Sequence, residues 1–320
     1  MERGLAMYPL AVVDLHCDTL TAFTAPGRCQ NTLDDPCASL SLTCLPRGTR
    51  WCQCFAIFIP DGLSPAESAG YYRCHQQSFM RQMELFASRV APCRTAADIE
   101  AAWAQGKTAA LLTVENGAAL AGDLDRVDVL VRDGVRMMTL TWNGENEIGS
   151  GIASDHGLTS FGKSLIPCME AAGILVDVSH LNDRGFDDLL EVAKKPFVAS
   201  HSNARRVCSH KRNLTDNQIR ELTARHCLIG LNYYVEFLRD DGHPTPEDLF
   251  AHVDHFLALG AEDCLVLGSD FDGADLPPWL DSPEKVAGLY GRFLERGYAP
   301  ALCDKIFFGN ALVFFRENLH

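Results

Sequence analysis

Short apolar runs alternate with longer amphipathic segments along almost the whole chain, and this alternation limits the folds that the chain can adopt. Continuous short apolar runs are typical of strands in a parallel sheet covered on both faces. The sequence therefore predicts parallel strands joined by helices. The apolar runs lie near residues 11–15, 53–59, 109–114, 135–140, 174–178, 196–199, 227–231 and 264–268. Helical periodicity fills intervals at 66–88, 97–104, 124–132, 161–172, 183–193, 215–225 and 245–259.

Eight parallel strands with intervening helices describe a (β/α)8 TIM barrel, an α/β fold of usually about 250 residues. The chain has 320 residues, and we expect the surplus in long loops at 17–50 and 142–160 and in a C-terminal helical extension after Asp281. No linker or repeat divides the sequence, which predicts a single domain over residues 1–320. A doubly wound open sheet has the same alternation but would hold its edge strands far apart.

Composition restricts the partners and the compartment. The chain is 47% hydrophobic with a formal charge of -14, so we expect a globular protein that does not bind nucleic acid. A secretory signal and a long apolar span are not apparent, which predicts no membrane insertion and a cytoplasmic location. The 13 cysteines are an odd, scattered set that suits a reducing compartment. Cys52 and Cys54 lie in an apolar run, so both are expected to be structural, as is Cys17.

Polar residues close the apolar runs in a repeated manner. His16 and Asp18 follow the first run with the two-residue spacing that places side chains on one face of a strand. Barrel strands end at one mouth, which is where barrel enzymes carry their active sites. Asp14 lies deeper and is expected to form buried hydrogen bonds. The full set of polar residues at strand ends is His16, Asp18, Glu115, His180, His201 and Asp270.

Three histidines and three carboxylates exceed what one tetrahedral zinc ion needs. Two cations about 3.5–4 Å apart that share one carboxylate would use the whole set. The sequence therefore predicts a binuclear site. Zinc suits imidazole and carboxylate ligands, although manganese, cobalt and iron also accept them.

The same residues resemble the membrane (renal) dipeptidase family, peptidase family M19, among the metal-dependent amidohydrolase-like barrels. The resemblance covers nearly the whole chain. Its motifs are Asp14-Leu-His16-Cys-Asp18, Val114-Glu115-Asn-Gly117, Leu140-Thr-Trp-Asn143, Asp177-Val-Ser-His180, Ser200-His201-Ser202, Arg212-Asn213 and Gly268-Ser-Asp270-Phe-Asp-Gly273.

The resemblance implies a zinc-dependent dipeptidase with two Zn²⁺ per chain. His16 and Asp18 would hold one ion, His180 and His201 the other, and Glu115 would bridge them. A hydroxide between the ions would attack the peptide carbon. Asp270 would be the acid and base of the reaction, transferring a proton from the attacking water to the departing amine.

The resemblance also implies a substrate pocket. Arg212 would receive the dipeptide carboxylate, which suits the guanidinium fork, although a solvated loop cation is the alternative. Tyr234 resembles a pocket aromatic of the family, and packing alone is again the alternative. Better-known members place a histidine where this chain has Trp142, so the substrate pocket must differ there. His156 in the following loop is a candidate substitute, although loop histidines are commonly solvated.

Other activities remain open at this point. A barrel amidohydrolase acting on a lactone, a cyclic amide or another small amide would use similar ligands, and a barrel that has lost catalysis would serve as a binding module. The preferred dipeptide is not evident, and a D-residue at its second position is an option. The family often dimerises, so a homodimer is an expectation.

Overall fold

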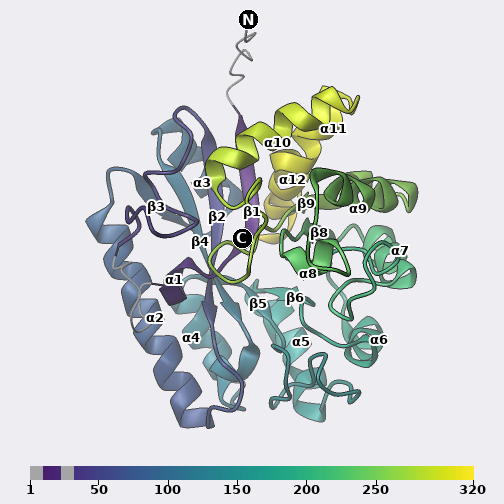
Figure 1. Cartoon of the computed structure of the whole chain (residues 1–320). Helices are drawn as coiled ribbons and strands as arrows, with labels where there is room; N and C mark the ends of the chain where they lie inside the picture. Colours follow the sequence, from purple (N-terminus) through teal and green to yellow (C-terminus); the bar gives the residue numbers. More distant parts are fainter. Residues whose placement is uncertain (1–9, 23–31) are drawn as a thin grey trace, which may run out of the picture.

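The computed structural model describes residues 10–22 and 32–320 and contains a closed barrel of eight parallel strands (Figure 1). β1 pairs with β2 on one side and with β9 on the other, and a β2–β4 ladder closes the ring. The predicted (β/α)8 barrel is therefore confirmed. The barrel strands are β1 (Ala11–Cys17), β2 (Arg50–Phe58), β4 (Thr108–Glu115), β5 (Val135–Thr139), β6 (Leu175–Asp177), β7 (Val198–Ala199), β8 (Leu228–Leu231) and β9 (Leu265–Leu267).

A ninth strand, β3 (Val90–Cys93), lies outside the ring and was not predicted. It pairs with the first half of β4, while β5 pairs with the second half of the same edge. β3 has only four residues and contains Pro92, which cannot donate a ladder hydrogen bond. A proline of this kind is tolerated at a sheet edge, so the short strand has little sequence signal.

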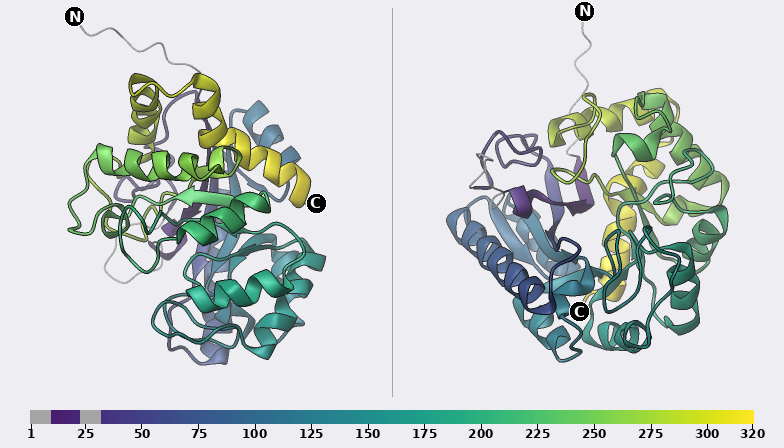
Figure 2. Two further views of the ribbon diagram at one scale, coloured as in Figure 1. Left: turned by 90° about the vertical axis from the view of Figure 1, so that its right-hand side faces the viewer. Right: turned by 60° about the horizontal axis from the view of Figure 1, so that its bottom comes forward.

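Helices surround the strands, as Figure 2 shows from two further directions. The segments predicted as helical are all helical, with ends that differ by a few residues. Thr215 caps one of them, because its hydroxyl accepts a hydrogen bond from the Gln218 amide at 3.2 Å. These helices are α2 (Pro65–Leu85), α3 (Ala96–Ala104), α4 (Arg126–Asp133), α5 (Ser160–Ala172), α6 (Asp183–Val192), α7 (Asp216–Ala224) and α9 (Pro246–Ala258).

The C-terminal extension is also helical, as expected. It begins at α10 (Pro283–Glu295) and continues through α11 (Pro300–Asp304), a π-helical turn (Lys305–Gly309) and α12 (Asn310–Asn318). Short helices α1 (Thr19–Ala22), η1 (Gly117–Leu120), α8 (Val235–Leu238) and η2 (Ala261–Asp263) lie in the loops after strands or between elements. Within the described ranges, each helix is too short or too polar to span a bilayer.

The amino-terminal half of the barrel interior is apolar and is covered by α12, which is yellow in Figure 2. Residues from every barrel strand meet α12 here, and Phe314 and Phe315 supply its aromatic rings. Cys52 and Cys54 belong to this cluster and are structural, as predicted, whereas Cys17 is buried in the outer cluster. The strand residues include Val13, Leu15, Cys52, Cys54, Leu111, Met137, Leu175, Val198, Leu228 and Val266.

β1 contains an irregularity that redirects its last residues. Its register against β2 shifts between Asp14 and Cys17, so one strand gains a residue relative to the other. Leu15 joins the interior cluster and His16 also reaches the barrel mouth, which strict alternation would forbid. Strict alternation would place Asp14 and His16 on one face of the strand, but the register shift falls between Asp14 and Cys17 and interrupts this alternation.

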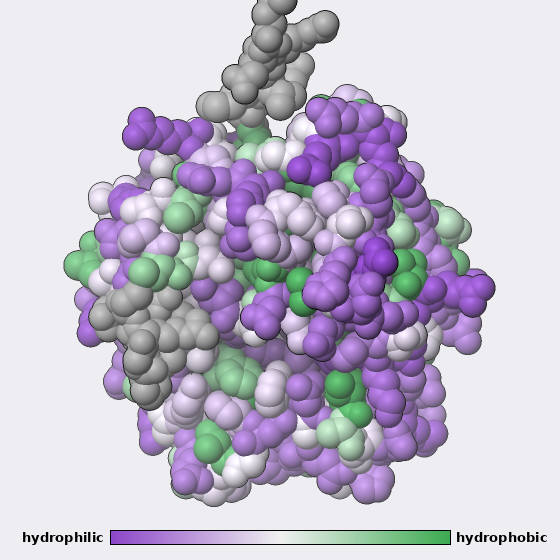
Figure 3. Space-filling view, in the orientation of Figure 1, coloured by the Kyte–Doolittle hydropathy of each residue, from purple (hydrophilic) through white to green (hydrophobic). Residues whose placement is uncertain are grey.

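The molecular face in Figure 3 is mostly hydrophilic, with apolar residues in small separate groups. Among the described residues, the large apolar side chains that are exposed are Met80, Leu85 and Val313. The predicted loop at 142–160 is present and folds on itself through a bridge between Glu145 and Ser150. Part of the predicted loop at 17–50 lies outside the described residues; its described part consists of α1 and turns at 32–49.

Candidate metal centre

Six side chains from the carboxyl ends of five strands converge at the barrel mouth. All six are at most 8% exposed. Their ligand-type atoms form two overlapping triads, His16–Glu115–His201 and His16–Asp18–Asp270, in each of which the atoms lie within 4.8 Å of one another. His180 joins the first triad through Glu115. The six residues are those singled out in the sequence: His16, Asp18, Glu115, His180, His201 and Asp270.

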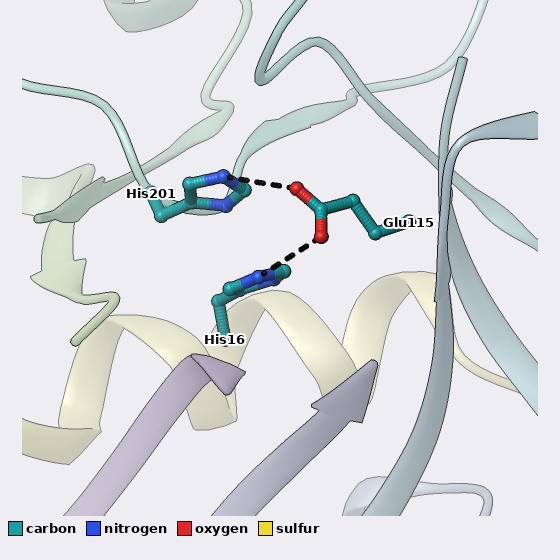
Figure 4. A group of neighbouring side chains, drawn as sticks. All are labelled: His16, Glu115 and His201. Carbon is teal, nitrogen blue, oxygen red and sulfur yellow. Dashed lines mark ion pairs between the residues drawn. The ribbon is translucent and has the colours of Figure 1, made fainter. Parts of the chain in front are cut away.

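Glu115 lies at the centre of the cluster, with its two oxygens turned to different partners (Figure 4). Oε1 is 2.7 Å from Nε2 of His180 and 3.7 Å from Nε2 of His201. Oε2 is 3.7 Å from Nε2 of His16. Nε2 of His16 is also 3.4 Å from Asp18 Oδ2 and 3.8 Å from Asp270 Oδ1. One carboxylate thus separates two groups of possible ligands.

The hydrogen-bond partners of His201 fix its tautomer. Asp177 accepts from the Ser179 and Ser200 amides at 2.9 and 3.0 Å and from the Ser200 hydroxyl. Because the Ser200 hydrogen is given to Asp177, the Ser200 oxygen accepts from Nδ1 of His201, 2.7 Å away. The His201 proton therefore lies on Nδ1, which leaves a lone pair on Nε2.

The proton of His180 also lies on Nδ1, where a different residue accepts it. Its Nδ1 lies 3.0 Å from Oδ1 of Asn143, an acceptor, so its Nε2 also carries a lone pair. The Nε2 atoms of His180 and His201 are only 3.0 Å apart. Two lone pairs that face each other repel, whereas a cation between or beside them would satisfy both. The donor set therefore fits a metal ion.

The carboxylates add two further signs of a cation site. Oδ1 of Asp18 is buried without a hydrogen-bond partner, which is costly unless an ion compensates it. Burial disfavours a charged imidazole at His16, but Asp18, Glu115 and Asp270 together outweigh burial and raise its pKa to about 10. The negative potential that stabilises an imidazolium would equally stabilise a metal ion.

Burial also shifts the pKa values of four other members, and the shifts of the two histidines suit metal binding. Burial, with Arg212 and His16 nearby, lowers the pKa of His180 and that of His201 well below the usual range, so both remain neutral ligands. Burial raises the pKa of Glu115 and that of Asp270.

Two glycines permit the close approach of strands beneath the cluster. A Cβ on Gly230 or on Gly268 would come within 1.8 or 1.9 Å of the Ser200 carbonyl oxygen. Without these Cβ atoms, the end of β7 moves against β8 and β9, and the Ser202 amide donates to the Gly230 carbonyl at 2.8 Å. His201 thereby stacks on His16 with ring centroids 3.9 Å apart.

Two members of the cluster have left-handed backbone conformations. His180 has a φ of 71° and Asp270 a φ of 67°. Non-glycine residues adopt such values at a cost of about 1–3 kcal/mol, and they concentrate at functional sites. Each residue lies three positions after the last residue of its strand, β6 for His180 and β9 for Asp270.

The cluster opens into a cavity of about 770 Å³. Arg212 reaches it from the loop after β7, and Tyr234 precedes α8. Arg212 is buried, its Nε has no hydrogen-bond partner, and its guanidinium lies over the Phe237 ring at 5.3 Å. Its guanidinium donates a long hydrogen bond to the His201 carbonyl, at 3.5 Å. A buried cation with free donors in a cavity can bind an anionic group.

Comparison with known proteins decides the family. The family model for membrane dipeptidase, peptidase family M19, matches residues 6–319. The chain belongs to the membrane dipeptidase family, M19. It is thus a metallodipeptidase, a hydrolase of dipeptides, as the sequence motifs predicted.

Two solved peptidase structures agree with this assignment, and an uncharacterized curated relative matches most of the chain. A dipeptidase described as an M19 metallopeptidase superposes with a TM-score of 0.91 at 27% identity, covering 98% of this chain and 99% of that one. A metallopeptidase from Rhodobacter sphaeroides has a TM-score of 0.91 at 26% identity over 97% and 99%. An uncharacterized protein encoded in the pqqA 5' region of Klebsiella pneumoniae is 34% identical over 238 residues, 71% of this chain and 88% of that protein.

Trp142, the departure from the M19 pattern, lines the cavity beside the cluster. Its ring centroid is 6.2 Å from that of His180 and 4.9 Å from that of Phe58. His156 does not replace the missing family histidine, because its side chain is 82% exposed and bonds Glu145 at 2.7 Å. This part of the M19 pocket is therefore aromatic.

Several supporting residues were not predicted as functional. Asn143, Ser200 and Asp177 orient the two histidines, and Asn232 donates to Asp270 Oδ2 at 3.0 Å. Asn143, Asp177 and Ser200 each stand in a motif quoted for the family, which is the signal that could have identified them. Asp14 is buried as expected and accepts hydrogen bonds from the His16 and Ser269 amides and from Gln53.

Proposed function

We propose that this chain is a dipeptidase with two zinc ions, in which Glu115 bridges an ion held by His16 and Asp18 and an ion held by His180 and His201. The single observation that carries the proposal is the division of Glu115, with one oxygen toward His180 and His201 and the other toward His16. The facing lone pairs of His180 and His201 add support.

Two bound zinc ions would supply a nucleophilic water of lowered pKa and polarise the scissile carbonyl. Asp270 would be the residue of this chain that transfers the proton. Its Oδ1 faces the cluster, and Asn232 holds its Oδ2. Burial raises the pKa of this carboxyl, which makes it a better proton acceptor than an exposed aspartate. Asp270 would take the proton of the attacking water and deliver it to the departing amine.

Arg212 would bind the carboxylate of the dipeptide. Burial lowers its pKa to about 10, so it remains a cation at neutral pH. Its unpartnered Nε and the cavity in front of it supply donors where a carboxylate would lie. Tyr234 packs edge-on against Phe237 at 4.7 Å and would form the adjacent wall of the substrate pocket.

The second residue of the substrate can have D configuration in this proposal. The R. sphaeroides metallopeptidase was solved with a phosphinate mimic of the dipeptide L-Ala-D-Ala, and it matches 97% of this chain. The cavity of about 770 Å³ would leave room for this residue beside the cluster.

Metal analysis of the purified protein and a dipeptide panel with L- and D-residues at the second position test the proposal. We expect two zinc ions per chain and hydrolysis of dipeptides with a free carboxylate. Arg212→Glu should raise KM for dipeptides by roughly 10- to 100-fold, as expected for the loss of a charged hydrogen bond. Hydrolysis of lactones or cyclic amides in place of dipeptides would contradict the proposal and favour an amidohydrolase.

We also propose a single domain over residues 1–320, a homodimer and a cytoplasmic location. The ring closes between β1 and β9, the first and last barrel strands, which supports one domain. Cys52, Cys54 and Cys227 are buried and form no disulfide, which suits a reducing compartment. Analytical ultracentrifugation measures the oligomeric state, and cell fractionation measures the location.

A further inference from the structure

We infer that the substrate of this site is a dipeptide that carries a large apolar side chain, aromatic or branched aliphatic, and that Trp142 selects it. The inference rests on the proposed function and names its substrate class. It is carried by an apolar wall, made of Phe58, Trp142 and Ile152, that lines the cavity beside His180.

The wall comes from two regions of the chain. Phe58 is the last residue of β2, and Trp142 and Ile152 lie in the loop after β5. The Phe58 and Trp142 rings meet edge to face at an interplanar angle of 71°, an arrangement favoured by aromatic quadrupoles. All three side chains are partly exposed, so they present apolar surface to the cavity.

Backbone contacts fix Trp142 in place. A Cβ on Gly151 would lie 1.8 Å from the Trp142 carbonyl oxygen, so the loop segments that contain these two residues are in close contact. The Gly151 amide donates to the Gly144 carbonyl and the Ala153 amide to that of Asn143, both at 2.8 Å. Asn143 in turn holds His180. The backbone that carries Trp142 is thereby linked to the metal centre.

The chemistry of the wall defines what it can recognise. The indole of Trp142 offers one hydrogen-bond donor, and Phe58 and Ile152 offer none. An apolar side chain would cover this surface and exclude water from it. A polar or charged side chain would lose hydration there without gaining partners, which costs binding energy. Arg212 and His210, by contrast, line the cavity with cationic or polar groups that suit the carboxylate.

Steady-state kinetics on two dipeptide series, X-Ala and Ala-X with X as Ala, Leu or Phe, test the inference. For the wild-type zinc enzyme, we expect kcat/KM at one position to rise about tenfold or more from Ala to Leu or Phe. In Trp142→Ala this ratio should fall at least tenfold, since apolar pockets discriminate by about 10- to 200-fold. Trp142→Phe should retain most of the ratio, and Trp142→His should lose it.

Leu85→Ala, an exposed change on α2, is the matched control and should retain the wild-type ratio. Zinc content and unfolding temperature, measured for every variant, identify any that fails to fold. Ile152→Ala supplies a second change in the wall and should also reduce the ratio. An unchanged ratio in Trp142→Ala, or an equal loss on every substrate, would overturn the inference. If the wild type hydrolyses no dipeptide, the proposed function itself fails.

Discussion

The two ends of the barrel are built on opposite principles. At the amino-terminal end, apolar side chains from every strand pack against Phe314 and Phe315 of α12. At the carboxyl-terminal end, six ionisable side chains are buried together around Glu115. The first end gains stability from burial, whereas the second holds lone pairs and a left-handed backbone that disfavour folding. Stability and chemistry are therefore separated along the barrel axis.

The largest expected effect is on chemistry at the carboxyl-terminal end. Asp270→Asn removes the proposed proton acceptor and should lower kcat by about 10²- to 10⁴-fold while zinc content remains unchanged. Stopped assays with metal analysis on the same sample measure both. Asp128→Asn, at an exposed site on α4, is the control. Near-normal turnover in Asp270→Asn would remove Asp270 from the mechanism.

A substitution at the amino-terminal end should instead lower stability and leave substrate binding unchanged. Phe315 is 1% exposed, so Phe315→Ala should lower the free energy of unfolding by about 3–5 kcal/mol through lost burial and a cavity. Denaturant titration measures the loss. KM should stay at its wild-type value in the folded fraction, and the exposed Val313→Ala on the same helix should have little effect. A large change in KM would show that the ends are not independent.

The outer helical layer supplies a pH test that involves neither end. Burial lowers the pKa of His252 to about 4, and its Nδ1 accepts from the Ala204 amide at 3.1 Å. In the unfolded chain, a histidine binds its proton near pH 6.5. The stability that the buried, neutral His252 contributes to the folded state is therefore fully present above pH 6.5 and is lost as the pH falls toward 4. The loss is roughly 3 kcal/mol.

His252→Gln should flatten this part of the stability curve, measured by urea titration between pH 7 and pH 4. His243→Gln, at an exposed position, should leave the curve as it is. Equal slopes in the wild type and His252→Gln would assign the acid sensitivity to other groups.

The smallest expected effect concerns the support of one histidine. Ser200→Ala removes the acceptor that holds the His201 proton on Nδ1, and should weaken zinc binding by about 10- to 100-fold. Competition with a chromophoric chelator measures the affinity directly. Ser164→Ala, at an exposed site on α5, is the control. Unaltered affinity would mean that the Ser200 hydroxyl does not orient His201.

The sequence predicted the barrel and the six converging residues because both follow from strong, repeated patterns. Apolar runs place strands, and parallel strands in a ring bring their carboxyl ends together. Local departures from the regular barrel had no such repeated pattern in the sequence. The bulge in β1, the strand that contains Pro92 and the positive φ values of His180 and Asp270 arise from tertiary contacts. The contact between Asn143 and His180 was hidden for the same reason, since only the fold brings these two residues together.

The position of α12 has a consequence for biosynthesis. α12 is translated after all the strands that it covers, and β1, translated first among them, takes β9 as a neighbour. Until α12 has been synthesised, a nascent chain therefore exposes the apolar end of the barrel interior, and one edge of β1 stays unpaired until β9 follows. The barrel therefore cannot complete its folding before α12 has been synthesised, which gives chaperones a defined interval in which to act.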